Sequence, residues 1–179
     1  MKIETERLII RSIEHDDEKA FIKIASDNSL TEIGFDADCG TWISEWITEA
    51  RILEQKDDPR KDYIAYAVEL RSSHELIGTV GCSYYSETER IGIVYGIGAA
   101  HRNNGYACEA AKAYIRFFFE HYDEAELTAE IKDDNLPSRK TAEKAGFVLK
   151  EKRKYKDIYD TEEHLYRSYS VKRSDLISE

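Results

Sequence analysis

Three short apolar runs at close spacing constrain the fold of this chain more than any other feature of its sequence. They cover residues 63–70, 75–84 and 90–97, and polar turns divide them. Runs of this length and spacing predict an antiparallel meander. The pattern then changes to a helical period, with a long amphipathic helix expected from about residue 105 to residue 122. The order predicts a sheet that packs against helices.

The segments on either side of the meander extend this sheet. Further strands are expected at residues 7–11, 126–131, 148–156 and 165–171, and further helices at about 15–25, 42–53 and 137–145. Antiparallel strands followed by alternating strands and helices are typical of an α+β domain with a mixed sheet. No repeat or Pro-, Gly- or Ser-rich linker interrupts the pattern. We therefore expect residues 1–179 to form a single domain.

The charge balance limits the partners of the protein. The chain has 36 acidic and 26 basic side chains, a formal charge of −10 at pH 7. This surplus argues against nucleic acid as a partner and favours a cationic one. No apolar run approaches the ~18 residues of a membrane span, and the first residues carry no apolar leader, so we expect a cytoplasmic protein with no membrane partner. The three cysteines form no C-x-x-C pair, which predicts neither a disulfide framework nor a metal site.

The segment from Tyr95 to Ala107 joins a predicted strand to the long helix and contains the strongest chemical signal. The first amides of a helix lack internal partners and lie at the positive end of its dipole, so such a junction can bind a phosphate. Gly105 at the helix start costs up to ~1 kcal/mol against alanine, which favours close approach of a ligand to the backbone. The alternative is that Asn104 caps the helix and Gly105 only eases the turn.

Two other phosphate motifs do not fit this segment. Gly96 and Gly98 open like a dinucleotide fingerprint, but His101 stands where the third glycine is needed. The strands that precede it also form a predicted antiparallel meander instead of a parallel βαβ unit. No glycine-rich loop ending in Gly-Lys-Ser/Thr is present in the sequence. The junction is therefore neither a Rossmann site nor a P-loop.

These residues resemble the GCN5-related N-acetyltransferases (GNAT family), in particular the branch of the ribosomal-protein N-terminal acetyltransferases. Thr5-Glu6-Arg7-Leu8-Ile9-Ile10-Arg11 is similar to the opening strand of that branch. Arg102-Asn103-Asn104-Gly105-Tyr106-Ala107 matches the pyrophosphate loop Arg/Gln-x-x-Gly-x-Gly/Ala. Asn135 and Ser138, followed by Glu143-Lys144-Ala145-Gly146-Phe147, resemble the second signature. Two ordered motifs are much more specific than either alone.

The resemblance implies the GNAT fold, with the central sheet splayed between its fourth and fifth strands, and acetyl-CoA as co-substrate without a metal. The backbone at Arg102, Asn103, Asn104, Gly105, Tyr106 and Ala107 would hold the pyrophosphate. The pantetheine arm would lie along Tyr95, Gly96 and Ile97, where amides freed by the splay pair with the ligand. Asn135 would contact the cofactor. Ser138 would act near the sulfur as a general acid or hydrogen-bond donor, unless it is only a capping or solvent hydroxyl.

The implied reaction is transfer of the acetyl group to a primary amine by direct attack on the thioester. The acceptor is left open between a protein N-terminus and a small cationic amine, and dimers, which are common in this branch, leave a homodimer open as well. The sequence also departs from the family pattern. Ala142 stands where many members carry a tyrosine acid, and the strand at Gly92 lacks a glutamate base. The base is therefore unassigned, and the alternative function is a catalytically silent CoA-binding or regulatory module.

Overall fold

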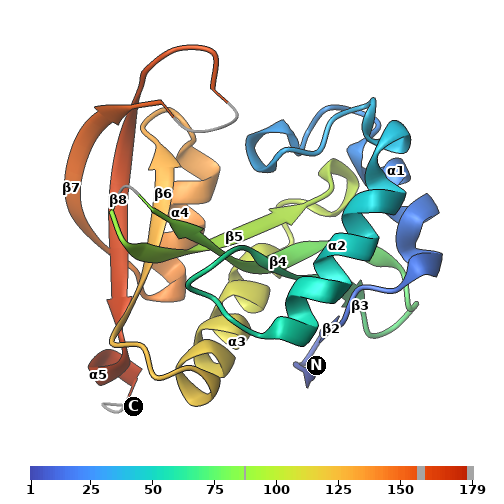
Figure 1. The fold of residues 1–179 in the computed structure, drawn as a ribbon, viewed down its shortest axis with the longest axis horizontal. Helices are drawn as coiled ribbons and strands as arrows, with labels where there is room; N and C mark the ends of the chain where they lie inside the picture. Colours follow the sequence, from blue (N-terminus) through green and yellow to red (C-terminus); the bar gives the residue numbers. More distant parts are fainter. Residues whose placement is uncertain (87, 157–159, 177–179) are drawn as a thin grey trace.

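A mixed sheet forms the centre of the molecule (Figure 1). The structure is a computed structural model and describes residues 1–86, 88–156 and 160–176. Its strands follow the order β1-β2-β3-β4-β5-β6-β8-β7, with every neighbouring pair antiparallel except β5 and β6, which are parallel. The strands are β1 Lys2–Glu4, β2 Leu8–Arg11, β3 Ile64–Leu70, β4 Leu76–Tyr85, β5 Arg90–Ile97, β6 Glu126–Lys132, β7 Val148–Tyr155 and β8 His164–Lys172. The predicted α+β class and mostly antiparallel sheet are confirmed.

Helices cover both faces of this sheet. Side chains alternate along β3, so that Tyr66 and Val68 join the core on the side of α3 and α4, while Ala65 and Ala67 pack with α1 and α2. The α-helices are α1 Glu18–Ala25, α2 Ile43–Lys56, α3 Tyr106–His121, α4 Leu136–Ala145 and α5 Arg173–Leu176. Short 3-10 turns are η1 His15–Asp17, η2 Thr31–Ile33, η3 Cys39–Thr41 and η4 Ala99–His101.

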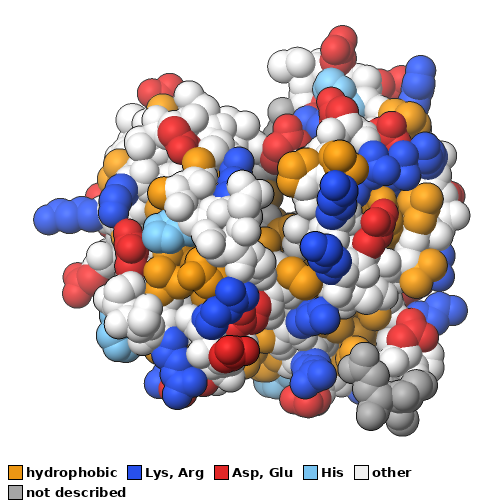
Figure 2. Space-filling view, turned by 180° about the vertical axis from the view of Figure 1, so that it is seen from behind, with side chains coloured by type: hydrophobic (Ala, Val, Ile, Leu, Met, Phe, Trp, Pro, Cys, Tyr) orange, Lys and Arg blue, Asp and Glu red, His pale blue; other side chains and the backbone are white. Residues whose placement is uncertain are grey.

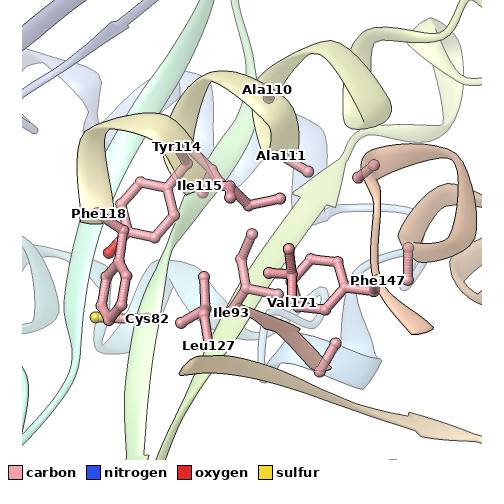
Figure 3. Packing of buried hydrophobic residues seen from close by; sticks show 14 of the residues in the cluster. Cys82, Ile93, Ala110, Ala111, Tyr114, Ile115, Phe118, Leu127, Phe147 and Val171 are labelled. Carbon is pink, nitrogen blue, oxygen red and sulfur yellow. The ribbon is translucent and has the colours of Figure 1, made fainter. Parts of the chain in front are cut away.

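The larger core lies between α3 and the middle of the sheet (Figure 3). Tyr114 and Phe118 of α3 are fully buried and point toward Cys82, Ile93 and Leu127 of the strands. Because α3 buries one side along its whole length, its axis is fixed against the sheet. Its first turn is therefore held beside the end of β5.

The N-terminal elements differ from the sequence prediction in two places. Residues Lys2–Glu4 form an additional edge strand, with Lys2 opposite Arg11. Its charged residues are exposed and only Ile3 is half-buried, so the segment carries too little apolar pattern to predict. The predicted helix at 15–25 begins with the turn His15–Asp17, because Asp17 accepts a hydrogen bond from the Glu14 amide at 2.8 Å and two from Arg11, each at 2.8 Å.

The sheet opens between β5 and β6, as the resemblance implied. Within the described residues these strands share one paired position, Gly92 with Thr128, although β5 continues to Ile97 and β6 to Lys132. Figure 1 shows β6, β7 and β8 standing at a steep angle to β4 and β5. The second half of β5 therefore has a neighbouring strand on one edge only.

Candidate active site

The start of α3 presents backbone amides that have no partner. Gly105 is the N-cap residue, with φ +80°, and Asn103 also has a positive φ, 63°. No side chain caps the helix, and in the described part of the chain the amides of residues 103–108 donate to no protein acceptor. Left-handed residues on both sides of Asn104 are typical of a backbone nest, an arrangement whose N–H groups suit an anion.

The alternative role of Asn104 as helix cap is wrong. Its side-chain nitrogen instead donates to the carbonyls of His101 and Arg102, at 3.2 and 3.0 Å. Asn104 therefore closes the loop before the helix and leaves the helix amides free. The glycine conformation at residue 105 is required as well, because φ +80° is strained for residues with a side chain.

The Arg102 side chain stabilises the loop from within. Its Nε donates to the carbonyl oxygen of Ile97 at 3.0 Å, and one terminal nitrogen donates to the carbonyl of Ser29. It thus ties the end of β5 to the segment that follows α1. Arg102 is one of the residues predicted to hold the pyrophosphate, and its guanidinium group stabilises the loop.

A second set of contacts joins the loop to Thr5 and Arg7 near the N-terminus, and no residue spacing in the sequence predicts it. The Glu109 carboxylate accepts hydrogen bonds from the Thr5 hydroxyl at 2.6 Å, the Arg7 amide at 2.9 Å and the Arg7 Nε at 2.7 Å. Arg7 also donates to the Asn104 carbonyl at 2.9 Å. Burial would raise the pKa of Glu109, but the bonds from Thr5 and Arg7 outweigh it and hold that pKa below its usual value.

The free edge of β5 exposes alternate backbone groups. Gly98 donates to Ile77 of β4 at 2.9 Å, so the antiparallel ladder turns the amides of Gly96 and Val94 toward β4 as well. The backbone N–H and C=O groups of Tyr95 and Ile97 then face away from β4. This agrees with the hydrogen bond that the Ile97 carbonyl accepts from Arg102. Two of the three predicted pantetheine contacts therefore face the opening, whereas the backbone of Gly96 faces its neighbour strand.

On the face of β5 opposite α3, two glycines leave room for side chains from other segments. A Cβ on Gly92 would lie 2.4 Å from Cε2 of Tyr85, and one on Gly96 would lie 2.4 Å from Cδ1 of Ile33. The space of a residue-92 side chain is occupied by the Tyr85 ring. No carboxylate can therefore project from this position without moving Tyr85.

The beginning of α4 lies against β5 on the other face. Asn135 caps α4, accepting from the Ser138 amide at 3.1 Å. The Tyr95 hydroxyl donates to the Ser138 carbonyl at 3.0 Å and lies 3.1 Å from its hydroxyl. Burial raises the pKa of Tyr95 to about 12, although the bond to Ser138 lowers it. Sequence spacing could not reveal this pair, since the two residues are 43 positions apart and meet through strand–helix packing.

Two further observations bound the chemistry. Among the described residues, no three His, Cys, Asp or Glu side chains are grouped so that they could hold a metal ion. In the same part of the chain, none of the helices combines the length and apolar character that crossing a bilayer demands.

The site consists of an anion-binding loop at a helix start, next to a strand whose free edge lies in a splayed sheet. This arrangement defines a class of protein. Residues 7–148 match the family model described as acetyltransferase (GNAT) domain. The chain belongs to the GNAT family of acetyltransferases, and the expected acyltransferase class is confirmed.

Individual relatives agree with this assignment. The uncharacterized N-acetyltransferase YjdG of Bacillus subtilis (strain 168) is 28% identical over 157 residues, which are 84% of this chain and 91% of the relative. A GNAT-family acetyltransferase from Bacillus anthracis has a TM-score of 0.80 at 20% identity and covers 97% of this chain and 99% of its own. RimL, a ribosomal L7/L12 alpha-N-protein acetyltransferase solved with coenzyme A, has a TM-score of 0.77 at 14% identity, covering 96% of this chain and 98% of its own.

Proposed function

We propose that this acetyltransferase uses acetyl-CoA to acetylate a primary amine. The observation that carries the proposal is the row of unpartnered amides at residues 103–108, which opens beside the free edge of β5. Coenzyme A combines an anionic diphosphate with an amide-containing arm, so it complements both features. Its occurrence with RimL, which shares the fold, supports the same ligand here.

The proposed binding roles follow from these groups. The amides of Asn103 through Ala107 hold the diphosphate, with Arg102 and Arg7 stabilising the loop. The backbone groups of Tyr95 and Ile97 pair with the arm of the co-substrate along the free edge of β5. Asn135 supports α4 through its cap and places Ser138 beside Tyr95. All these groups come from elements anchored in the core, which limits their motion.

In the proposed reaction the amine nitrogen attacks the thioester carbon, and the carbon–sulfur bond breaks. The departing sulfur then needs a proton. Tyr95 and Ser138 share a hydrogen bond and form a donor pair for this step. Because the pKa of Tyr95 is raised to about 12, its hydroxyl remains protonated at neutral pH and can donate. This tyrosine takes the place of the one that Ala142 replaces.

The proposed acceptor is a protein N-terminus or a small cationic amine. The charge of −10 favours the approach of a cation. RimL is described as an alpha-N-protein acetyltransferase, which supports a protein N-terminus as the first class to test.

Calorimetry with acetyl-CoA, followed by a thiol-release assay over a panel of amines, tests the proposal. The panel includes a short peptide with an N-terminal serine and spermidine. We expect saturable acetyl-CoA binding and amine-dependent release of free thiol. Binding without release over the whole panel would support the silent CoA-binding module instead. Absence of acetyl-CoA binding would contradict the proposal.

A further inference from the structure

A pocket of about 400 Å³ lies beside the start of α3. The residues that α3 contributes to it are Gly105, Cys108 and Lys112, which recur at helical spacing and share one face of the helix. The buried residues of α3, such as Ala110 and Tyr114, lie on the side that packs against the sheet. The pocket therefore opens on the face of α3 that is turned away from the sheet.

Two other segments complete the pocket. Thr5, Glu6 and Arg7 line it from the turn between β1 and β2, and Lys144 comes from the last turn of α4. Nη2 of Arg7 lies 3.4 Å from the position of a Cβ on Gly105, so the guanidinium borders the helix start directly. The pocket and the proposed diphosphate loop thus share Gly105 as a common wall.

The pocket is cationic although the protein as a whole is acidic. Its lining carries three basic and two acidic side chains, whereas the whole chain has a formal charge of −10. Arg7 and Glu109 bind each other at 2.7 Å and so compensate their charges. The Lys112 and Lys144 side chains are exposed, and neither ammonium is paired with a carboxylate among the residues that the structure describes. Since Glu6 is the other acid of the lining, the two lysines leave a net positive charge.

Both lysines can reach an anion that is bound at the helix start. Lys112 lies about 10 Å along the helix axis from Gly105, and helical side chains lean toward the N-terminus, which brings its ammonium back toward the loop. Lys144 lines the same pocket from the side of α4. Figure 2, a view from behind, shows Lys and Arg side chains in a row below the hollow at the upper edge of the molecule.

We propose that Lys112 and Lys144 bind the 3′-phosphate of the coenzyme A moiety in this pocket, an inference that rests on the proposed function. Coenzyme A carries this third phosphate on its adenosine ribose, and lysine binds phosphate as a point charge. With the diphosphate on the amides of residues 103–107 and the arm along the free edge of β5, the adenosine lies at the other end of the diphosphate. A cationic pocket that shares Gly105 with the loop continues from it on the side away from the sheet. The two lysines thus make the enzyme select 3′-phosphorylated coenzyme A over the dephosphorylated form.

The test compares acetyl-CoA with acetyl-3′-dephospho-CoA, which lacks only that phosphate. Calorimetry at low ionic strength should show that the wild-type protein binds acetyl-CoA about tenfold more tightly. Lys112→Ala and Lys144→Ala should each reduce this ratio about threefold, and the double variant should bring it near one, because both charges are then absent. Affinity for the dephosphorylated ligand should keep its wild-type value in all three variants.

A matched variant separates contact with the phosphate from a general effect of charge. Lys19 is an exposed lysine of α1, which packs on the opposite face of the sheet, so Lys19→Ala removes the same charge far from the pocket and should leave the ratio unchanged. Equal wild-type affinity for the two ligands would overturn the assignment. So would a loss of affinity for both ligands alike in the pocket variants, or an equal drop of the ratio in Lys19→Ala. Failure of the wild-type protein to bind either ligand would contradict the proposed function itself.

Discussion

Two glycines show how a single residue shapes the site. Gly105 and Gly146 both have positive φ, +80° and +105°, so alanine at either costs about 1–2 kcal/mol in backbone strain. Nothing lies within 4 Å of a Cβ at Gly146, which ends α4 away from the loop. We expect both Gly105→Ala and Gly146→Ala to lower the melting temperature, but only Gly105→Ala to weaken acetyl-CoA binding in calorimetry. Equal affinities for the two variants would remove the loop from the proposed site.

The Tyr95 hydroxyl gives a second prediction at this scale. Tyr95→Phe removes the proton donor but retains the ring that packs against the core, so kcat should fall by about 100-fold with little change in acetyl-CoA affinity. Because the acid form persists below a pKa of about 12, loss of the Tyr95 proton should not reduce wild-type kcat up to pH 10. Tyr122→Phe is the control, since it removes a buried hydroxyl bonded to Asp57 at 2.6 Å, outside the proposed site. A normal kcat in Tyr95→Phe would exclude the phenol as the acid.

At the scale of elements, the hydrogen bonds between Arg7 and Glu109 of α3 position the loop. Glu109→Gln weakens the charge-assisted bonds to Arg7, which should reduce the free energy of unfolding by about 1.5 kcal/mol and weaken acetyl-CoA binding. The folded-state pKa of Glu109 is depressed, so its stabilising effect exists above the unfolded value, 4.5, and is lost as pH falls through the folded value. Denaturant unfolding at pH 7 and at pH 3 therefore should show the difference between variant and wild type shrinking at the lower pH.

The control for this tie is an exposed ion pair elsewhere. Lys23 lies 3.0 Å from Glu75, and their side chains are 74% and 39% exposed. Lys23→Ala should change neither stability nor affinity measurably. If Glu109→Gln, like Lys23→Ala, leaves stability and acetyl-CoA affinity unchanged, the contacts of Glu109 with Thr5 and Arg7 do not position the loop.

Element patterns also decide how much could be predicted from the sequence. The meander, α3 and α4 have apolar periods set by burial on one face, so their existence and order followed from residue spacing. The Tyr95 contact with Ser138 and the Arg7 contact with Glu109 depend on how elements pack, and no local spacing encodes them.

At the scale of the whole molecule, the central sheet has two parts that are joined only where β5 pairs with β6. Strands β5 and β6 share the Gly92 and Thr128 position, and the Glu32 and Lys132 pair spans the opening beyond it. A ligand held by the start of α3 and by the free edge of β5 fills that opening. Its binding should therefore protect a specific set of backbone amides, because the alternation of β5 assigns each amide to one side.

Amide hydrogen exchange resolved by residue tests this arrangement. Without ligand, the amides of Val94 and Gly96 should be protected through β4, whereas those of Tyr95 and Ile97 should exchange faster. Saturating acetyl-CoA should slow exchange at Tyr95 and Ile97 and at residues 103–107, and change Val94 and Gly96 less. Coenzyme A without the acetyl group should give the same pattern, because the diphosphate and the arm make the contacts. Protection that is uniform along β5 would indicate general stiffening of the sheet and would contradict an arm lying on its free edge.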